Sequence, residues 1–201
     1  MNSPIGASAF DAAWRTQWPD CRPVGHELRS SAHETWARFH SLPESKRYAE
    51  NEAEYDELLT RHFTLLSELS SSTSTPTDDL RVITVAWSES PEHGERDSGL
   101  ISAFPEGHYW RSIAYDLSNL DHPVWTHLFV GSTALDTDEL RSLLLLVADD
   151  GTREVIICPP GLNWLYHPYD GGGDVIAPDH TTRDILRARH ADWLPDNPQG
   201  L

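Results

Sequence analysis

The sequence predicts one compact α+β domain, in which three to four helices pack on a mainly antiparallel sheet. Apolar residues recur at helical spacing in some segments, and strand-like apolar runs lie between these segments without strict alternation. Eight tryptophans, six tyrosines and five phenylalanines among 201 residues supply the apolar area for a core. A chain of this length can bury a core without a metal ion or a disulfide.

Residues 1–70 are expected to contribute helices and one strand that pack on the main domain. Phe10, Trp14 and Trp18 recur every four residues, which predicts a helix with one buried face. Residues 36–42 combine aromatic residues with polar alternation, so they are expected to form a strand.

A second helix is predicted over residues 50–69, where leucines recur at helical spacing after an acidic first turn. The Ser- and Thr-rich segment 71–79 then has the composition of a flexible connection. Residues 80–201 are expected to form the sheet domain.

Within that domain, strands are expected over residues 80–87, 109–115 and 125–130, and a helix begins after the polar segment 136–139. The last part of the chain contains three further short apolar runs separated by turn residues. These runs predict an antiparallel meander over residues 154–158, 164–166 and 174–177. Thr181 and Asp184 have the spacing of a capping box, so they are expected to begin the last helix.

The charge balance is strongly acidic, with 15 basic against 32 acidic residues and a net charge of -17. Phosphate backbones and anionic lipid surfaces would be repelled, so no nucleic acid or membrane partner is expected. A basic protein is the complementary partner. The alternative is that the acidity only serves solubility.

The compartment is expected to be the cytoplasm. No apolar run approaches the roughly 18 to 20 residues that span a bilayer, and no secretory signal pattern is found at the N-terminus. Cys21 and Cys158 form no CxxC pair and are expected to be inert buried thiols.

The segment 167–174, His-Pro-Tyr-Asp-Gly-Gly-Gly-Asp, has the most unusual composition in the chain. It places an imidazole, a phenol and two carboxylates on a backbone whose glycines are free to adopt positive φ. Candidate ligand-binding residues are the four polar ones and a nearby indole, namely Trp164, His167, Tyr169, Asp170 and Asp174. The alternative is a plain connection between strands, in which Asp170 closes an Asx-type turn.

No metal ion or cofactor is expected. The segment fails the calcium-loop pattern, because Gly172 and Thr181 stand where ligands belong. His26 and His33 begin like a zinc-binding HExxH motif, but neither has a second histidine four residues later. No GxSxG nucleophile motif is found either.

The tryptophans could form a stacking surface for sugars or cationic ligands, but a core role is favoured for most of them. Trp14, Trp18, Trp87, Trp125 and Trp193 all lie in predicted helices or strands. Trp164 is the exception, because it lies just before the glycine-rich segment.

Two stretches resemble an uncharacterised bacterial family known only as a domain of unknown function. The first is residues 163–176, Asn-Trp-Leu-Tyr-His-Pro-Tyr-Asp-Gly-Gly-Gly-Asp-Val-Ile, together with Arg189, Trp193 and Leu194. The second, residues 38–48, is similar to actinomycete members of that group. The Tyr-Asp-Gly-Gly part is the most specific. The resemblance implies a bacterial cytoplasmic protein and carries no established activity.

The favoured function is therefore a non-enzymatic protein-binding module of the immunity or antitoxin kind, whose acidic surface docks a basic protein. The alternative is a small-molecule or metal-dependent enzyme with its site at residues 167–174. The oligomeric state is left open by the sequence.

Overall fold

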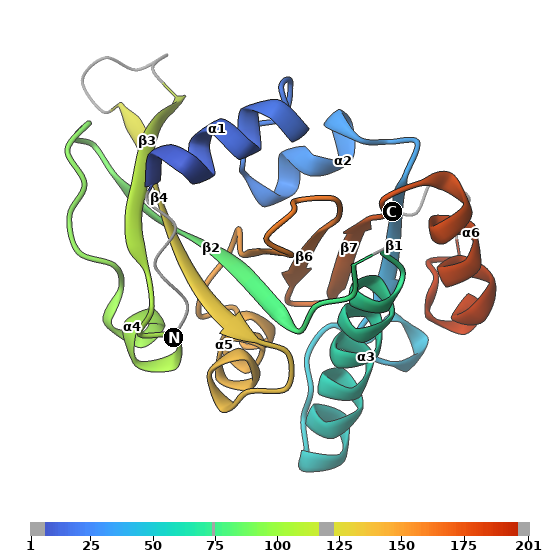
Figure 1. Ribbon diagram of the computed structural model, residues 1–201. Helices are drawn as coiled ribbons and strands as arrows, with labels where there is room; N and C mark the ends of the chain where they lie inside the picture. Colours follow the sequence, from blue (N-terminus) through green and yellow to red (C-terminus); the bar gives the residue numbers. More distant parts are fainter. Residues whose placement is uncertain (1–6, 74, 117–122, 197–201) are drawn as a thin grey trace.

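The fold is α+β, as the sequence predicts, with one antiparallel sheet of seven strands (Figure 1). The computed structural model describes residues 7–73, 75–116 and 123–196. The strand order is β1-β7-β6-β5-β2-β4-β3, and every neighbouring pair is antiparallel. The strands are β1 (Trp36–His40), β2 (Asp79–Ser88), β3 (His108–Asp116), β4 (Val124–Ala134), β5 (Ile156–Cys158), β6 (Leu165–Tyr169) and β7 (Gly172–Ile176).

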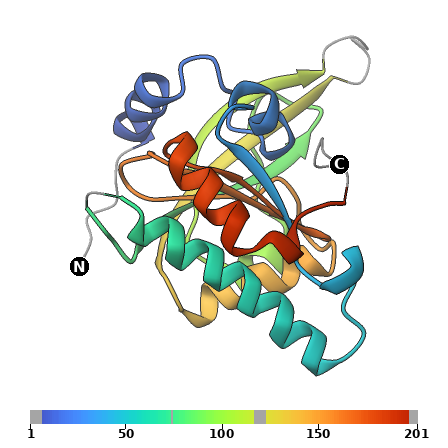
Figure 2. The ribbon, with the colours of Figure 1, turned by 90° about the vertical axis from the view of Figure 1, so that its right-hand side faces the viewer.

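Helices lie on both faces of this sheet. The described residues form α1 (Ala7–Gln17), α2 (Leu28–Ser31), α3 (Glu52–Ser71), α4 (Ser98–Ala103), α5 (Asp138–Ala148) and α6 (His180–Arg189). Three short 3-10 segments are η1 (Gly25–Glu27), η2 (Pro43–Ser45) and η3 (Ala191–Trp193). In Figure 1, α3, α4 and α5 lie on one side of the sheet, and α1 and α2 lie on the other. Figure 2 shows α6 beside the edge strand β1.

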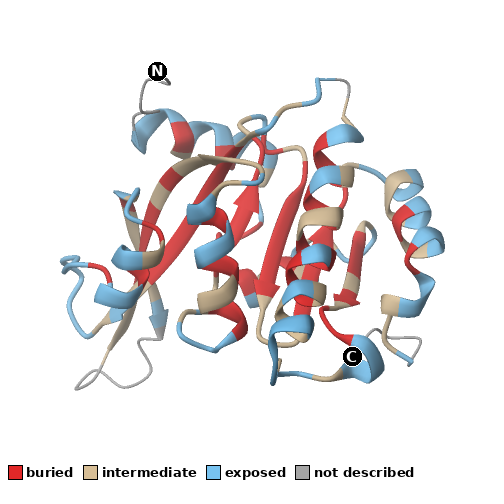
Figure 3. Cartoon of the chain, turned by 90° about the horizontal axis from the view of Figure 1, so that it is seen from below, coloured by how far each residue is buried: buried red, intermediate tan, exposed pale blue. Residues whose placement is uncertain are grey.

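The core consequently has two layers, one on each side of the sheet. The leucine stripes of α3 and α5 fill the first layer, as their helical spacing predicts. Phe10 and Trp14 of α1 pack against Trp110 in the second layer. Figure 3 shows the buried residues gathered on the sheet and on the helix faces that meet it.

The predicted meander is confirmed, since β5, β6 and β7 pair in succession. The glycines have a different role from the expected one. Gly172 and Gly173 belong to β7 rather than to the turn, and neither has a φ in the left-handed region. A Cβ on Gly172 would lie 2.1 Å from the backbone oxygen of Phe39, and one on Gly173 would lie 2.3 Å from Tyr166 Oη. These glycines permit close packing.

The prediction for the start of the last helix is wrong by two residues. Asp179, not Thr181, caps α6, and its side chain accepts a hydrogen bond from the backbone N–H of Thr182 at 2.7 Å. An aspartate and a threonine can both cap a helix, and here the aspartate comes first in the chain. Thr181 lies inside the first turn.

The core prediction is wrong for Trp87, which is 47% exposed, and Trp125 is only half-buried and belongs to neither core layer. Trp87 is the next-to-last residue of β2, beyond Val85, which is the last buried side chain of that strand. Trp14, Trp36, Trp110 and Trp164 are buried.

Cys21 and Cys158 are free buried thiols, and burial raises the pKa of Cys158 to about 12. That thiol is therefore a poor nucleophile. In the part of the chain that the structure describes, no helix is both long enough and apolar enough to cross a bilayer.

Candidate functional site

A groove of about 680 Å³ lies where β1, β7 and β6 meet the η1–α2 segment. This volume is within the range of roughly 300 to 1,000 Å³ that is typical of small-molecule sites. Its lining is rich in arginine and histidine side chains. The lining residues are His26, Arg29, Arg38, His40, Ser45, Arg47, His167, Tyr169, Asp170, Gly171 and Asp174.

The first pair of groove side chains is Arg38 and Asp174, and the alternation of side chains along β1 and β7 puts both on the same face of the sheet. Trp36, Arg38 and His40 share one face of β1, and Asp174 is the direct partner of Arg38 on β7. Arg38 Nε lies 2.8 Å from Asp174 Oδ1, and Nη2 lies 3.0 Å from Oδ2. Burial alone would lower the pKa of Arg38, but the hydrogen bonds to Asp174 raise it overall. The guanidinium group is thus firmly charged.

A second ion pair holds the tip of the hairpin. Asp170 accepts a hydrogen bond from Arg47 Nε at 2.7 Å and another from the Tyr48 hydroxyl at 2.9 Å. These contacts tie Asp170 to the segment that follows η2. The bond to Asp170 raises the pKa of the Tyr48 phenol, which therefore stays protonated.

His167 and Tyr169 line the groove from β6. His167 Nδ1 lies 2.8 Å from the carbonyl oxygen of Val155, so this nitrogen donates the hydrogen bond. The ring packs on Gly25, where a Cβ would lie 2.3 Å from it. Burial raises the pKa of Tyr169, and the Arg38 guanidinium lies 5.2 Å from the centre of its ring.

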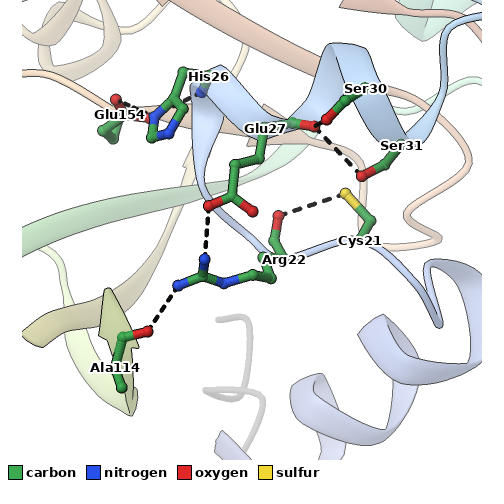
Figure 4. A network of polar contacts seen from close by, with 8 residues as sticks. All are labelled: Cys21, Arg22, His26, Glu27, Ser30, Ser31, Ala114 and Glu154. Atoms are coloured by element: carbon green, nitrogen blue, oxygen red, sulfur yellow. Dashed lines mark hydrogen bonds and ion pairs between the residues drawn. The ribbon is translucent and has the colours of Figure 1, made fainter. Parts of the chain in front are cut away.

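The η1–α2 segment is fixed by a network of polar contacts (Figure 4). Arg22 donates to Glu27 Oε1 at 2.8 Å and to the carbonyl oxygen of Ala114 at 2.9 Å. His26 Nδ1 lies 2.8 Å from Glu154 Oε1, and the His26 backbone N–H also donates to this carboxylate. This network holds His26 at the rim of the groove.

The net charge of the arginines and aspartates that line the groove is positive, whereas the net charge of the whole chain is negative. Three guanidinium groups, from Arg29, Arg38 and Arg47, stand against the two carboxylates of Asp170 and Asp174. Burial lowers the pKa of His40, and the nearby arginines lower it further. The charge of Arg38 therefore adds to the cost of a positive charge on His40, which burial already sets.

Four of the five candidate residues come together in the groove, namely His167, Tyr169, Asp170 and Asp174. Trp164 does not, since its side chain is fully buried in the core layer below the sheet. Among the residues that the structure describes, no three His, Cys, Asp or Glu side chains are placed to hold a metal ion together.

Sequence reasoning missed the lining residues from the N-terminal quarter of the chain, which are His26, Arg29, Arg38, His40, Ser45 and Arg47. Alternation in residues 36–42 could have placed Arg38 and His40 on one face. The pairing of β1 with β7 could not be found from local patterns, because the two strands lie more than 130 positions apart.

Comparison with known proteins gives one result. A family model described as "Domain of unknown function (DUF3885)" matches residues 24–198, which include every residue that lines the groove. No curated protein and no solved structure matches the chain.

Proposed function

The chain belongs to the DUF3885 family, a domain of unknown function, and we propose that it binds a small anionic ligand in the arginine- and histidine-lined groove. One observation carries the proposal: a chain with a net charge of -17 gathers three arginines and three histidines around one groove. A site for cations would be expected to expose carboxylates instead.

Both carboxylates of the groove are already paired with protein side chains, which favours an anionic ligand over a cation. Asp174 is engaged by Arg38, and Asp170 is engaged by Arg47 and Tyr48. A guanidinium group has five N–H donors. The pair with Asp174 uses Nε and Nη2 of Arg38, which leaves further donors for a ligand. Guanidinium groups bind phosphate and carboxylate groups through two parallel hydrogen bonds, so these are the ligand groups we propose.

The test is a thermal-unfolding panel of inorganic phosphate, pyrophosphate and citrate, with magnesium and calcium chloride as the cation arm. An anion at ten times its Kd should stabilise the fold by about 1.4 kcal/mol, or roughly 3–5 °C in a domain of this size. Arg47→Gln should reduce the shift to about a third, as a tenfold loss of affinity implies. Arg47 is 64% exposed, so its loss leaves the core intact. Arg15→Gln is the matched control, an exposed arginine of α1 that is also paired with an aspartate. Stabilisation by cations alone, or equal shifts in both variants, would argue against an anion site.

A second role in protein binding is proposed from the acidic remainder of the surface. A shallow groove between α3 and α5 is lined by Asp56, Glu68 and Asp136 and by the basic Arg141. Such a surface suits a basic protein, as in immunity or antitoxin modules, and we place the chain in a bacterial cytoplasm. If low-salt affinity capture from a bacterial lysate recovers no basic protein, the proposed protein-binding role is contradicted. The proposal of an anion site does not depend on this result.

A further inference from the structure

Two serines and a histidine from three neighbouring strands are joined by hydrogen bonds, at the end of the sheet away from the groove. Ser112 of β3 is the direct partner of His127 of β4, and its Oγ lies 2.7 Å from His127 Nδ1. On the other side of the ring, Ser88 Oγ of β2 lies 2.8 Å from Nε2. The His127 side chain is 1% exposed, so these contacts fix its orientation.

The hydrogen bonds also define which nitrogen carries the proton. Ser88 Oγ donates to the carbonyl oxygen of Ser90 at 3.0 Å, so it accepts from His127 Nε2. Nδ1 therefore offers a lone pair to the hydroxyl of Ser112. The Tyr109 hydroxyl, 2.9 Å from Ser112 Oγ, donates to the same oxygen.

The imidazole of His127 can act as a base only in its unprotonated form. Burial is the main cause that lowers the pKa of His127, and the electrostatic effect of the nearby His93 lowers it further. The ring is therefore neutral near pH 7, which is the form that a general base requires.

Ser112 is reachable although its base is buried. It is half-buried, and it lies on β3, the edge strand of the sheet. The β3–β4 register shifts on both sides of it, between Tyr109 and Arg111 and between Ala114 and Asp116. Such irregularities re-aim side chains at sheet edges and are frequent beside active sites.

We propose that Ser112 is a nucleophile toward small carboxylic esters, with His127 as its general base and Ser88 as a positioning residue. Ser112 Oγ forms a bond to the carbonyl carbon while its proton moves to His127 Nδ1. The bond from that carbon to the leaving oxygen breaks, and the alcohol departs with the proton from Nδ1. Water then attacks acyl-Ser112 and gives a proton to His127, which returns it to Ser112 Oγ as the carboxylic acid is released.

Ser88 fixes the tautomer of the histidine, as the aspartate does in a Ser-His-Asp triad, but the two ring nitrogens have exchanged roles, since Ser88 bonds Nε2 and the nucleophile faces Nδ1. A neutral hydroxyl stabilises the imidazolium less than a carboxylate does, so modest activity is expected. The Tyr109 hydroxyl is a donor within reach of the oxyanion that develops on the ester. This inference is independent of the anion-binding groove.

The experiment uses the full chain with a fluorophosphonate probe and with p-nitrophenyl acetate. The probe should add one phosphonyl group, located on Ser112 by peptide mass mapping, as the P–F bond breaks and fluoride leaves. Ser112→Ala should lose both the adduct and the hydrolysis of p-nitrophenyl acetate. His127→Gln should slow both reactions about 100-fold.

The role of Ser88 is tested by two variants that differ in whether they keep the hydroxyl group, because the His127 variant could also disturb packing. Ser88→Ala should slow labelling about tenfold, whereas Ser88→Thr keeps a hydroxyl and should keep the rate. Ser132→Ala, which removes a half-buried serine of β4, should change nothing. Absence of an adduct on the folded wild type, an adduct on another residue, or equal labelling of the Ser88→Ala and wild-type chains would overturn the proposal.

Discussion

Arg38 and Asp174 face each other across the β1–β7 ladder and form a two-point ion pair, although 136 positions separate them in sequence. Asp174 is 3% exposed, so its carboxylate depends on Arg38 for a counter-charge. The pair joins an N-terminal strand to the C-terminal hairpin and also lines the groove. Fold stability and ligand binding therefore share this contact.

Arg38→Ala should destabilise the fold by about 3–5 kcal/mol, because it leaves a buried carboxylate without its partner. The double variant with Asp174→Ala should cost less than the sum of the single variants, by about 1 kcal/mol or more. Urea unfolding of the four proteins measures this coupling. Strictly additive costs would show that the two side chains do not depend on each other.

Gly172→Ala should destabilise the fold by about 1–3 kcal/mol, because the added methyl group would meet the backbone oxygen of Phe39 and β1 would have to move away. Gly171→Ala is the matched control. Its Cβ would lie 3.6 Å from the nearest side-chain atom, which is an ordinary contact. Thermal unfolding compares the two variants, and equal losses would contradict the close-packing role of Gly172.

His62 should make the fold less stable as the pH falls. Its imidazole is buried beside the Tyr166 hydroxyl, and burial lowers its pKa from 6.5 to about 4. The unfolded chain therefore takes up the proton first, and stability is lost as the pH falls from about 6.5 towards 4. The contribution of His62 between pH 7 and pH 5 is about 2 kcal/mol.

The check is urea unfolding at pH 7 and pH 5 for the wild type and for His62→Gln. Glutamine can still bond the Tyr166 hydroxyl but does not titrate, so most of the loss assigned to His62 should disappear. An unchanged difference between the two pH values would assign the loss to other groups.

Much of the fold could be predicted from local patterns. The leucine spacing of α3 and α5 indicates buried helix faces, and turn residues between apolar runs indicate the meander of β5, β6 and β7. The glycines at positions 172 and 173 were misread as a loop, because the backbone and side-chain atoms that exclude a Cβ come from distant residues. Trp87 was misread because alternation cannot show where the core ends.

Only the part of the candidate site that comes from the C-terminal hairpin could be predicted from the sequence. The unusual composition of residues 167–174 indicated its C-terminal side, including Asp170 and Asp174. The arginines that neutralise these carboxylates come from the N-terminal part of the chain, and only strand pairing brings them close. For this reason the two carboxylates that the sequence offers as candidate ligand-binding groups belong to an arginine-rich groove in the structure.

The sign of the ligand charge is tested most directly by calorimetric titration of pyrophosphate into the wild type, Asp170→Asn and Arg47→Gln. The asparagine can still accept from Arg47 and Tyr48, but it removes one negative charge from the groove. We expect one pyrophosphate per chain, binding about three- to tenfold tighter in Asp170→Asn and about tenfold weaker in Arg47→Gln. Weaker binding in Asp170→Asn, or no heat of binding in the wild type, would contradict an anion site.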